Sequence, residues 1–216
     1  MEVTVEGPSP GPGPFLIVAN HISWMDILLI RQLIPGQFIA KEEIALCPVI
    51  GPGARRVGTL FISRNKLSSL HAIFRQVCRS LERGQSVVLF PEGTTTTGEQ
   101  LLPFRSGLFE SALRTGVPIL PLALRYESLT GPPNHATSYT GGESFGRSLW
   151  RTLGEDRIMA RLVLHPPIFP EKKSRKDLAA ETRLSILSTL SDTTPSRGRL
   201  PSPQAISSRS GRPPLA

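Results

Sequence analysis

The chain has 216 residues, 39% of them hydrophobic, which is enough for one domain with a substantial core. Its 25 Lys and Arg residues against 17 Asp and Glu give a net charge of +8, which suits nucleic acid, anionic lipid headgroups and phosphorylated substrates equally well. The two cysteines, Cys47 and Cys78, exclude a disulfide framework and have no metal-ligand spacing, so they indicate a reducing compartment.

The two ends of the chain are rich in proline. Residues 7–14 are expected to form an extended approach to the first strand, and residues 193–216 a disordered Pro/Ser/Arg-rich tail, which leaves residues 1–192 as the folded domain. The N-terminus lacks the charged and apolar regions of a signal peptide, and the longest apolar stretch, residues 15–30, is too polar to span a membrane. Any membrane contact is therefore expected to be peripheral.

Short apolar runs alternate with helical patterns along the chain. Strands are predicted over residues 15–20, 37–40, 57–63, 86–90, 117–124 and 158–165. Helices are predicted over residues 23–33, 66–83, 104–115 and 176–190. The alternation predicts an α/β fold, with a mixed, largely parallel sheet flanked by helices and functional groups gathered at the carboxyl ends of the strands.

The segment VANHISWMDILLI places His21 five residues before Asp26 in an apolar run. Ser23 to Asp26 has the S-x-x-D form of a capping box, which would put Asp26 in the first turn of a helix. A regular helix separates positions five apart by ~140°, so the two side chains can meet only if His21 lies in the turn before that helix. A carboxylate on one imidazole nitrogen leaves the other free to accept a proton. A helix cap and a catalytic pair are thus compatible interpretations, and the spacing alone favours neither.

Two further clusters follow predicted strands. Arg64 comes directly after FIS; alone it is an ordinary surface arginine, but if this strand ends near His21 its guanidinium suits a bidentate phosphate contact. The segment FPEGT predicts a tight turn, in which Glu92 can hold a hydroxyl and the backbone N–H of Gly93 or Thr94 can face a developing oxyanion. The alternative for this segment is an ordinary polar loop.

A fourth cluster, GVPILPLAL, has Pro118 and Pro121 inside a strand-like run. Because proline has no N–H to donate to a neighbouring strand, the run predicts an edge strand or a bulge. Its expected role is structural, in one wall of an apolar groove.

The four clusters form an ordered set along the chain: N-H-x-x-x-x-D at residues 20–26, F-I-x-R at 61–64, F-P-E-G-T at 90–94 and V-P-I-x-P at 117–121. Each is weak singly, but together they resemble the four blocks of the glycerolipid acyltransferases. The chain is most similar to the bacterial 1-acyl-sn-glycerol-3-phosphate acyltransferases, over residues 3–170. The segments KEEIALCPVIG and YTGGESFGRSLWRTLG also resemble connecting segments of bacterial members.

The resemblance implies a glycerol-3-phosphate acyltransferase-like fold and an O-acyltransferase with a His-Asp dyad, the HX4D motif. His21 would act as the general base on a free glycerol hydroxyl, oriented by Asp26, and the alkoxide would attack the thioester of acyl-CoA or acyl-carrier protein without an acyl-enzyme. The substrate-binding residues that it implies are Arg64, Glu92, Gly93 and Thr94, with Lys41 and Arg105 as further phosphate contacts. No metal or resident cofactor is implied, because the acyl thioester is a co-substrate.

The same resemblance implies a setting in phospholipid synthesis, with acylation of the sn-2 hydroxyl of a lysophospholipid to give phosphatidic acid. The protein would be peripheral at the cytoplasmic face of the membrane, with the acyl donor, the lysophospholipid and an anionic membrane surface as partners and no specific nucleic acid. A lyso-ornithine lipid acceptor, or hydrolysis of acyl thioesters, would use similar motifs. Family members commonly carry an N-terminal hydrophobic or amphipathic helix, whereas this chain starts almost at the first strand. Either its start is truncated or docking relies on other surfaces.

Two other classes of protein have some support in the sequence. The segment GESFG matches the nucleophile-elbow pattern G-x-S-x-G of serine hydrolases, but the turn-rich segment before Ser144 lacks a strand's apolar run, so the match is interpreted as chance. A basic nucleic-acid-binding protein would account for a pI of about 10.3 and the arginines of the tail. Against it, the core has no aromatic-basic interleaving, helix-turn-helix signature or zinc spacing.

Overall fold

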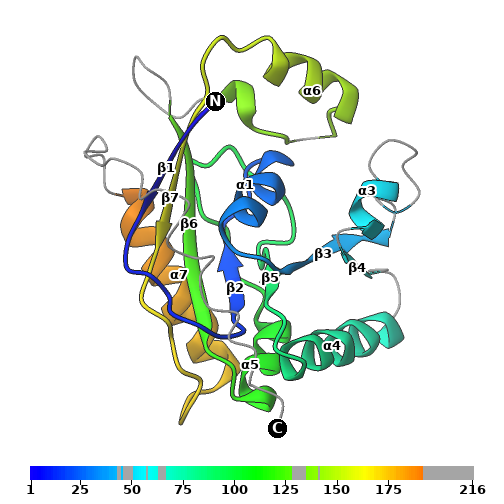
Figure 1. The fold of residues 1–216 in the computed structure, drawn as a ribbon, viewed down its shortest axis with the longest axis vertical. Coiled ribbons are helices and arrows are strands. Elements are labelled where there is room, and N and C mark those ends of the chain that lie inside the picture. Colours follow the sequence, from blue (N-terminus) through cyan, green and yellow to red (C-terminus); the bar gives the residue numbers. More distant parts are fainter. Residues whose placement is uncertain are drawn as a thin grey trace, which may run out of the picture.

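The computed structural model describes residues 1–42, 45, 51–56, 58–62, 67–127, 135–140 and 142–191, the side chains of Lys41, Leu67 and Ser68 excepted. Within these residues one seven-stranded sheet has the order β1-β7-β6-β2-β5-β3-β4 (Figure 1). The strands are β1 (Glu2–Glu6), β2 (Leu16–Ala19), β3 (Gln37–Lys41), β4 (Leu60–Ile62), β5 (Val87–Leu89), β6 (Ile119–Glu127) and β7 (Met159–Leu164). Neighbouring strands are parallel except β6 and β7, which confirms the expected mixed, largely parallel sheet.

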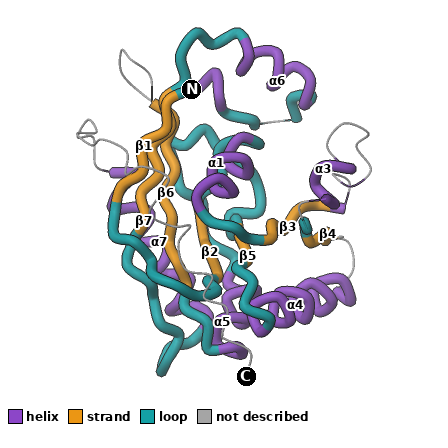
Figure 2. The backbone as a smooth tube through the Cα atoms, in the orientation of Figure 1, coloured by secondary structure: helices purple, strands orange, loops and turns teal. Residues whose placement is uncertain are grey.

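Helices lie around the sheet, as the purple segments of Figure 2 show. The described ones are α1 (Met25–Leu33), α3 (Gly51–Arg56), α4 (Leu67–Glu82), α5 (Glu110–Thr115), α6 (Phe145–Leu153) and α7 (Arg175–Ser191), with the 3-10 turns η1 (Ser106–Phe109) and η2 (His135–Thr137). Residues of α4, α5, η1 and α7 pack together on one face of the sheet, and α1 packs on the other. None of the described helices is long and apolar enough to cross a membrane.

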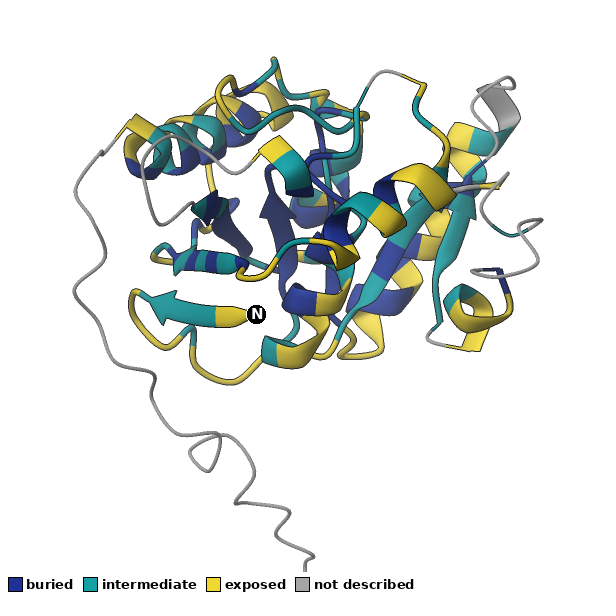
Figure 3. Ribbon diagram, turned by 90° about the horizontal axis from the view of Figure 1, so that it is seen from above, coloured by how far each residue is buried: buried dark blue, intermediate teal, exposed yellow. Residues whose placement is uncertain are grey.

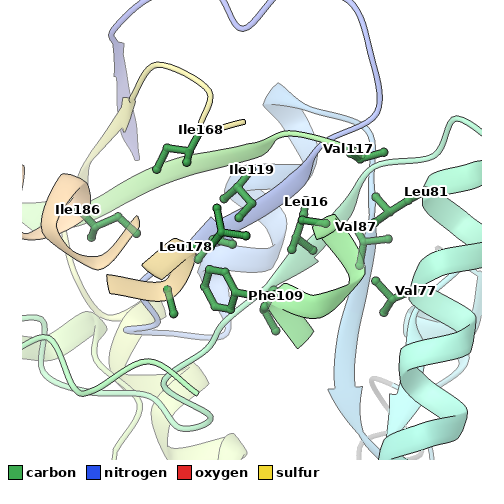
Figure 4. Packing of buried hydrophobic residues seen from close by; sticks show 14 of the residues in the cluster. Leu16, Val77, Leu81, Val87, Phe109, Val117, Ile119, Ile168, Leu178 and Ile186 are labelled. Atoms are coloured by element: carbon green, nitrogen blue, oxygen red, sulfur yellow. The ribbon is translucent and has the colours of Figure 1, made fainter. Parts of the chain in front are cut away.

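Strand β2 is buried on both faces, as its uninterrupted apolar sequence predicts. Leu16 and Val18 belong to the cluster that contains Phe109 and residues of α4, α5 and α7 (Figure 4). Ile17 and Ala19 belong to the cluster on the α1 side, because successive side chains of a strand point to opposite faces. Figure 3 shows the buried residues gathered on the central strands and on the inner faces of the helices. Asn20, which directly follows β2, therefore lies in the centre of the core.

The predicted helix over residues 66–83 is confirmed as α4. Its residues Ile73, Val77 and Leu81 are fully buried, and Gly84 has a φ of +77° just past its end, where a residue without a Cβ is favoured. Leu70 in the first turn of α4 is 46% exposed, so it lies outside the buried face of this helix. The predicted helix over residues 104–115 is divided into η1 and α5.

The strand β1, the helices α3 and α6 and the 3-10 turn η2 are not predicted from the sequence patterns. The first strand is β1 rather than residues 15–20, and it pairs in parallel with β7. Because β1 is short and only partly buried, its apolar signal is weak. The expected extended segment, residues 7–14, connects β1 to β2. The expected tail, residues 193–216, lies outside the described residues.

The expectation of an edge strand at Pro118 and Pro121 is wrong, because β6 lies inside the sheet between β7 and β2. The alternative expectation of a bulge agrees with the pairing. Leu122 faces Leu164, whereas Ile119 faces Ile168, so the pairing shifts by one residue across Pro121. The missing N–H of this proline thus falls where the regular ladder is interrupted, which is where a central strand tolerates it.

Candidate active site

The candidate site lies at the carboxyl ends of β2 and β5. His21 comes two residues after β2, and Glu92 comes three residues after β5. Because these strands are parallel neighbours, their carboxyl ends meet at the same edge of the sheet. The backbone N–H of His21 donates to Oε1 of Glu92 at 2.9 Å, so two segments 71 residues apart in sequence form one site.

His21 and Asp26 contact each other as the five-residue spacing allows. Nδ1 of His21 lies 2.8 Å from Oδ2 of Asp26, with His21 in the turn before α1 and Asp26 in its first turn. Since the carboxylate accepts from Nδ1–H, the second ring nitrogen, Nε2, is the one left to accept a proton. The side chain of His21 is 19% exposed, so part of it is open to a substrate.

Asp26 is completely buried and its carboxylate is held by four donors. Oδ2 accepts the backbone N–H groups of Ile22 at 2.7 Å and Ser23 at 3.0 Å besides the imidazole, and Oδ1 accepts the hydroxyl of Tyr126 at 2.7 Å. A buried carboxylate needs such a shell because desolvation penalises its charge. The shell fixes the position of Asp26 and, through it, the orientation of the imidazole.

The capping-box interpretation is half confirmed. Asp26 does reach back to the N–H of Ser23, which is one of the two bonds of that motif. The reciprocal bond is not formed: the buried hydroxyl of Ser23 has no hydrogen-bond partner in the described part of the structure, and α1 has no side-chain cap. The carboxylate of Asp26 therefore binds His21 and the turn before α1 rather than completing a helix cap.

Tyr126 is a site residue that the sequence patterns miss. It stands near the end of β6, 100 residues from Asp26, and is 2% exposed. Burial, the nearby Asp26 carboxylate and the hydrogen bond to it raise the pKa of the Tyr126 hydroxyl well above its ordinary value of 10.0, so it remains a donor. Its only signal in the sequence is a tyrosine at the end of an apolar strand.

The loops around His21 hold its backbone and its ring. The backbone N–H of Thr96 donates to the carbonyl of His21 at 2.9 Å. The ring of Phe90 stacks on the imidazole, with 4.0 Å between centroids and 14° between planes. His21 is therefore restrained on its N–H, its C=O and one face of its ring, which limits its rotamers before any substrate binds.

Glu92 joins two loops at this edge. It is 4% exposed, and its second oxygen, Oε2, accepts the backbone N–H of Leu102 at 3.0 Å. Burial raises the pKa of its carboxyl, while the N–H donors of Leu102 and His21 act in the opposite direction. The geometry gives Glu92 a positioning role for the His21 loop. That it also contacts an acceptor stays a prediction.

Of the two predicted oxyanion donors, the backbone N–H groups of Gly93 and Thr94, the first is used within the turn. The N–H of Gly93 donates to the carbonyl of Phe90 at 3.1 Å, so it closes the turn. Thr94, which is exposed, keeps the prediction. Gly93 has a φ of +76°, a backbone conformation that favours glycine, and a Cβ there would lie 3.2 Å from the side chain of Arg105, which would have to shift slightly.

An open pocket of about 550 Å³ lies beside the site. Phe90, which stacks on His21, lines it together with Gly93 and Arg105. The rest of the lining is mostly apolar and comes from β3, β4, β5, Pro91, α4, η1, α5 and α7. Its polar side chains are His71, Glu110 and Arg175. Pro118 and Pro121 are not among its lining residues, so their expected place in a groove wall is not observed here.

The remaining predicted residues have different outcomes. Arg64 lies outside the described residues, and of Lys41 only the backbone, at the end of β3, is described. Ser144 caps α6 by accepting the N–H of Arg147, and the described residues just before it, 135–140 and 142–143, form no strand, so the G-x-S-x-G segment is not a nucleophile elbow. Within the described residues, no group of three or more His, Cys, Asp or Glu side chains could hold a metal ion.

The chain is similar to known acyltransferases in sequence and in fold. The sequence model of the family described as Acyltransferase matches residues 2–125. The chain is 40% identical over 151 residues to the 1-acyl-sn-glycerol-3-phosphate acyltransferase of Neisseria meningitidis, which covers 70% of this chain and 59% of that protein. It therefore spans about three fifths of the length of that relative.

Two further comparisons cover more of the chain. It is 37% identical over 185 residues to the lyso-ornithine lipid O-acyltransferase of Pseudomonas aeruginosa, covering 86% of this chain and 70% of that one. The crystal structure of the 1-acyl-sn-glycerophosphate acyltransferase PlsC from Thermotoga maritima superposes with a TM-score of 0.64 at 28% identity, over 88% of this chain and 70% of that one. By sequence model, relatives and fold, the chain belongs to the Acyltransferase family.

Proposed function

We propose that this protein transfers a fatty acyl group from acyl-CoA or acyl-carrier protein to the sn-2 hydroxyl of 1-acylglycerol-3-phosphate, giving phosphatidic acid. The observation that carries this proposal is the restrained pair of His21 and the buried Asp26 at the carboxyl edge of the sheet. The name of the Neisseria relative supports the acceptor. The proposed place of action is the cytoplasmic face of a membrane, where such an acceptor is found.

In the proposed mechanism Nε2 of His21 takes the proton of the acceptor hydroxyl as its oxygen attacks the thioester carbonyl. The buried Asp26 carboxylate stabilises the imidazolium that forms. The tetrahedral intermediate then expels the thiolate, and the imidazolium returns the proton to that sulfur. The acceptor hydroxyl is the nucleophile, so no acyl-enzyme forms, and no resident cofactor takes part.

Cationic side chains near the pocket suit the phosphate of this acceptor. Arg105 is exposed on the pocket lining next to Gly93. Arg64 and Lys41 keep their predicted role as phosphate contacts. A guanidinium forms two parallel hydrogen bonds with a phosphate, so arginine suits this position better than lysine.

A lyso-ornithine lipid is the second candidate acceptor. The specific support is the Pseudomonas relative, which aligns over a larger share of this chain than the Neisseria one. The two acceptors share a free hydroxyl but differ in headgroup, because only the first carries a phosphate. Substitution of Arg105 therefore affects the two reactions differently if both occur.

The deciding experiment is an acyl-transfer assay of the purified full chain. Acyl-CoA and acyl-carrier protein are each offered with lysophosphatidic acid and with lyso-ornithine lipid, and the acylated product is measured. Turnover of lysophosphatidic acid at the higher kcat/KM supports the proposal. Turnover of the lyso-ornithine lipid alone would show that this lipid, and not lysophosphatidic acid, is the acceptor. Release of free fatty acid without either acylated product contradicts acyl transfer.

Replacing Tyr126 by phenylalanine is expected to lower kcat by roughly 10-fold with little change in KM, because Asp26 loses one of its four donors while no substrate contact is removed. Unfolding in denaturant is expected to show a loss of about 1–3 kcal/mol, the usual cost of an unpaired buried acceptor. Tyr139→Phe is the matched control, since Tyr139 is bonded to Ile22 and Thr95 through its backbone. A Tyr126→Phe protein that is destabilised but keeps its kcat would limit this residue to a structural role.

Replacing Ser144 by alanine is expected to leave acyl transfer within about 2-fold of the wild-type rate. Its hydroxyl accepts one N–H at the start of α6, so the change should cost about 1 kcal/mol of stability at most. Product formation and thermal unfolding measure the two effects. Loss of turnover by a folded Ser144→Ala protein would restore the hydrolase interpretation.

A further inference from the structure

Helix α6 exposes large apolar side chains and buries side chains with hydroxyl groups. Trp150 is 81% exposed and Leu153 is 70% exposed, whereas Ser148 is fully buried and Thr152 is 4% exposed. The hydroxyls of Ser148 and Thr152 have no hydrogen-bond partner in the described part of the chain. An ordinary surface helix buries its apolar stripe and leaves its hydroxyls in water.

The exposed Trp150 and Leu153 form one stripe with the half-buried Leu149. At ~100° per residue, Leu149, Trp150 and Leu153 lie within about 100° of one another on the helix surface, and the two buried hydroxyls lie on the other side. Arg147, which is exposed, lies beside this stripe next to Trp150. The sequence of α6, FGRSLWRTL, contains two arginines and no acidic residue. We call Leu149, Trp150 and Leu153 the α6 stripe.

Side-chain contacts of Arg151 hold α6 to the segment that precedes it in the chain. Arg151 donates from Nε to the carbonyl of Ala136 at 2.9 Å, from its two terminal nitrogens to the carbonyl of Ser138 and, at 2.6 Å, to the carboxylate of Glu143. Trp150 and Leu153 of the α6 stripe point outward, whereas Ser148 and Thr152 are buried.

The same helix lies close to the candidate active site. Phe145, its first residue, meets the ring of Trp24 edge-on at 5.6 Å, and Trp24 directly precedes α1. The backbone N–H of Tyr139 donates to the carbonyl of Ile22, the neighbour of His21, at 3.0 Å. Figure 1 accordingly shows α6 beside α1 and far from α4 and α5. Whatever covers the α6 stripe is thus brought near His21.

We propose that the α6 stripe inserts into the headgroup and upper acyl region of an anionic lipid bilayer and brings the active site to its lipid acceptor. Tryptophan and leucine on one side, with arginine beside them, are the composition of helices that lie in this interface, where arginines meet anionic headgroups and tryptophan sits at their level. The choice of a lipid surface rests on the proposed function, because a lysophospholipid acceptor resides in a membrane. The charge of the whole chain, +8, has the matching sign.

The first test compares vesicle binding of the full chain with that of the double variant Trp150→Ser/Leu153→Ser. Vesicles of phosphatidylcholine with phosphatidylglycerol are sedimented, and the bound protein is measured. Removal of the two most exposed side chains of the stripe is expected to weaken binding by roughly 10- to 100-fold. Because both side chains are exposed, thermal unfolding should stay close to that of the wild type.

The matched control is Phe169→Ser/Leu184→Ser, which removes one aromatic residue and one leucine of similar exposure, 60% and 64%, from the loop after β7 and from α7. This control is expected to bind vesicles like the wild type. Equal binding by all three proteins, or an equal loss in both double variants, would overturn the assignment to α6. Light scattering tests whether a second copy of the chain covers the α6 stripe. A wild-type dimer that becomes a monomer in Trp150→Ser/Leu153→Ser would also overturn the assignment of α6 to a lipid surface.

Turnover separates this inference from the proposed function. The Trp150→Ser/Leu153→Ser protein should keep its rate on a short-chain, water-soluble lysophosphatidic acid and lose rate on the same headgroup in vesicles. Vesicle binding that depends on α6 supports the inference even where the wild type acylates no acceptor, an outcome that contradicts the proposed function alone. Equal rates of variant and wild type on vesicle-borne acceptor contradict the inference alone.

Discussion

Replacing His21 by alanine is expected to lower kcat/KM for acyl transfer by roughly 10²- to 10⁴-fold, the usual contribution of a general base. The reason is that Nε2 is the nitrogen left to take the acceptor's proton once Asp26 accepts from Nδ1. Binding and positioning of the two substrates do not depend on the imidazole, so a residual rate should persist. Product formation at saturating donor, measured against acceptor concentration, gives the change in kcat and KM separately.

The matched control for this experiment is His135→Ala. His135 lies 3.4 Å from Glu99, with both side chains about half exposed, so its loss should matter little for stability or rate. The His21→Ala protein itself should remain folded, because Asp26 keeps two backbone donors and the Tyr126 hydroxyl. Wild-type turnover by a folded His21→Ala protein would contradict the proposed mechanism.

Replacing Asp26 by asparagine is expected to lower kcat by about 10²- to 10⁴-fold, because a neutral amide cannot stabilise the imidazolium as a carboxylate does. The fold should tolerate this change. The amide oxygen can take the place of Oδ2, and the hydroxyl of Tyr126 can rotate to accept from the amide nitrogen. Denaturant unfolding and kcat are measured on the same preparation.

Asp26→Ala separates the structural part from the catalytic part. It leaves the backbone N–H groups of Ile22 and Ser23 without their acceptor, so a loss of about 2–5 kcal/mol in stability is expected. The double variant His21→Ala/Asp26→Asn should be no slower than the slower single variant, because the two residues act as a unit. Additive losses in the double variant would argue against a dyad.

The sequence by itself determined the class of fold and the local part of the site. Apolar runs and helical periodicity predict β2, β3, β5, β6, β7, α1, α4 and α7 within a few residues, because burial in a parallel sheet requires such runs. The contact between His21 and Asp26 is compatible with the sequence, because a helix start at the S-x-x-D pattern allows the two side chains to meet. Interactions over a few residues depend on local backbone geometry, which the residue types largely specify.

Only the tertiary structure decided the parts that join distant segments. Tyr126 reaches Asp26 across 100 residues, and Glu92 holds the N–H of His21 across 71. The interior position of β6 depends on which strands pair, and a proline-containing run does not specify that. The sequence also does not show that the apolar side of α6 points outward. An amphipathic pattern has one apolar side, but the packing of Arg151 and the buried hydroxyls determines where that side points.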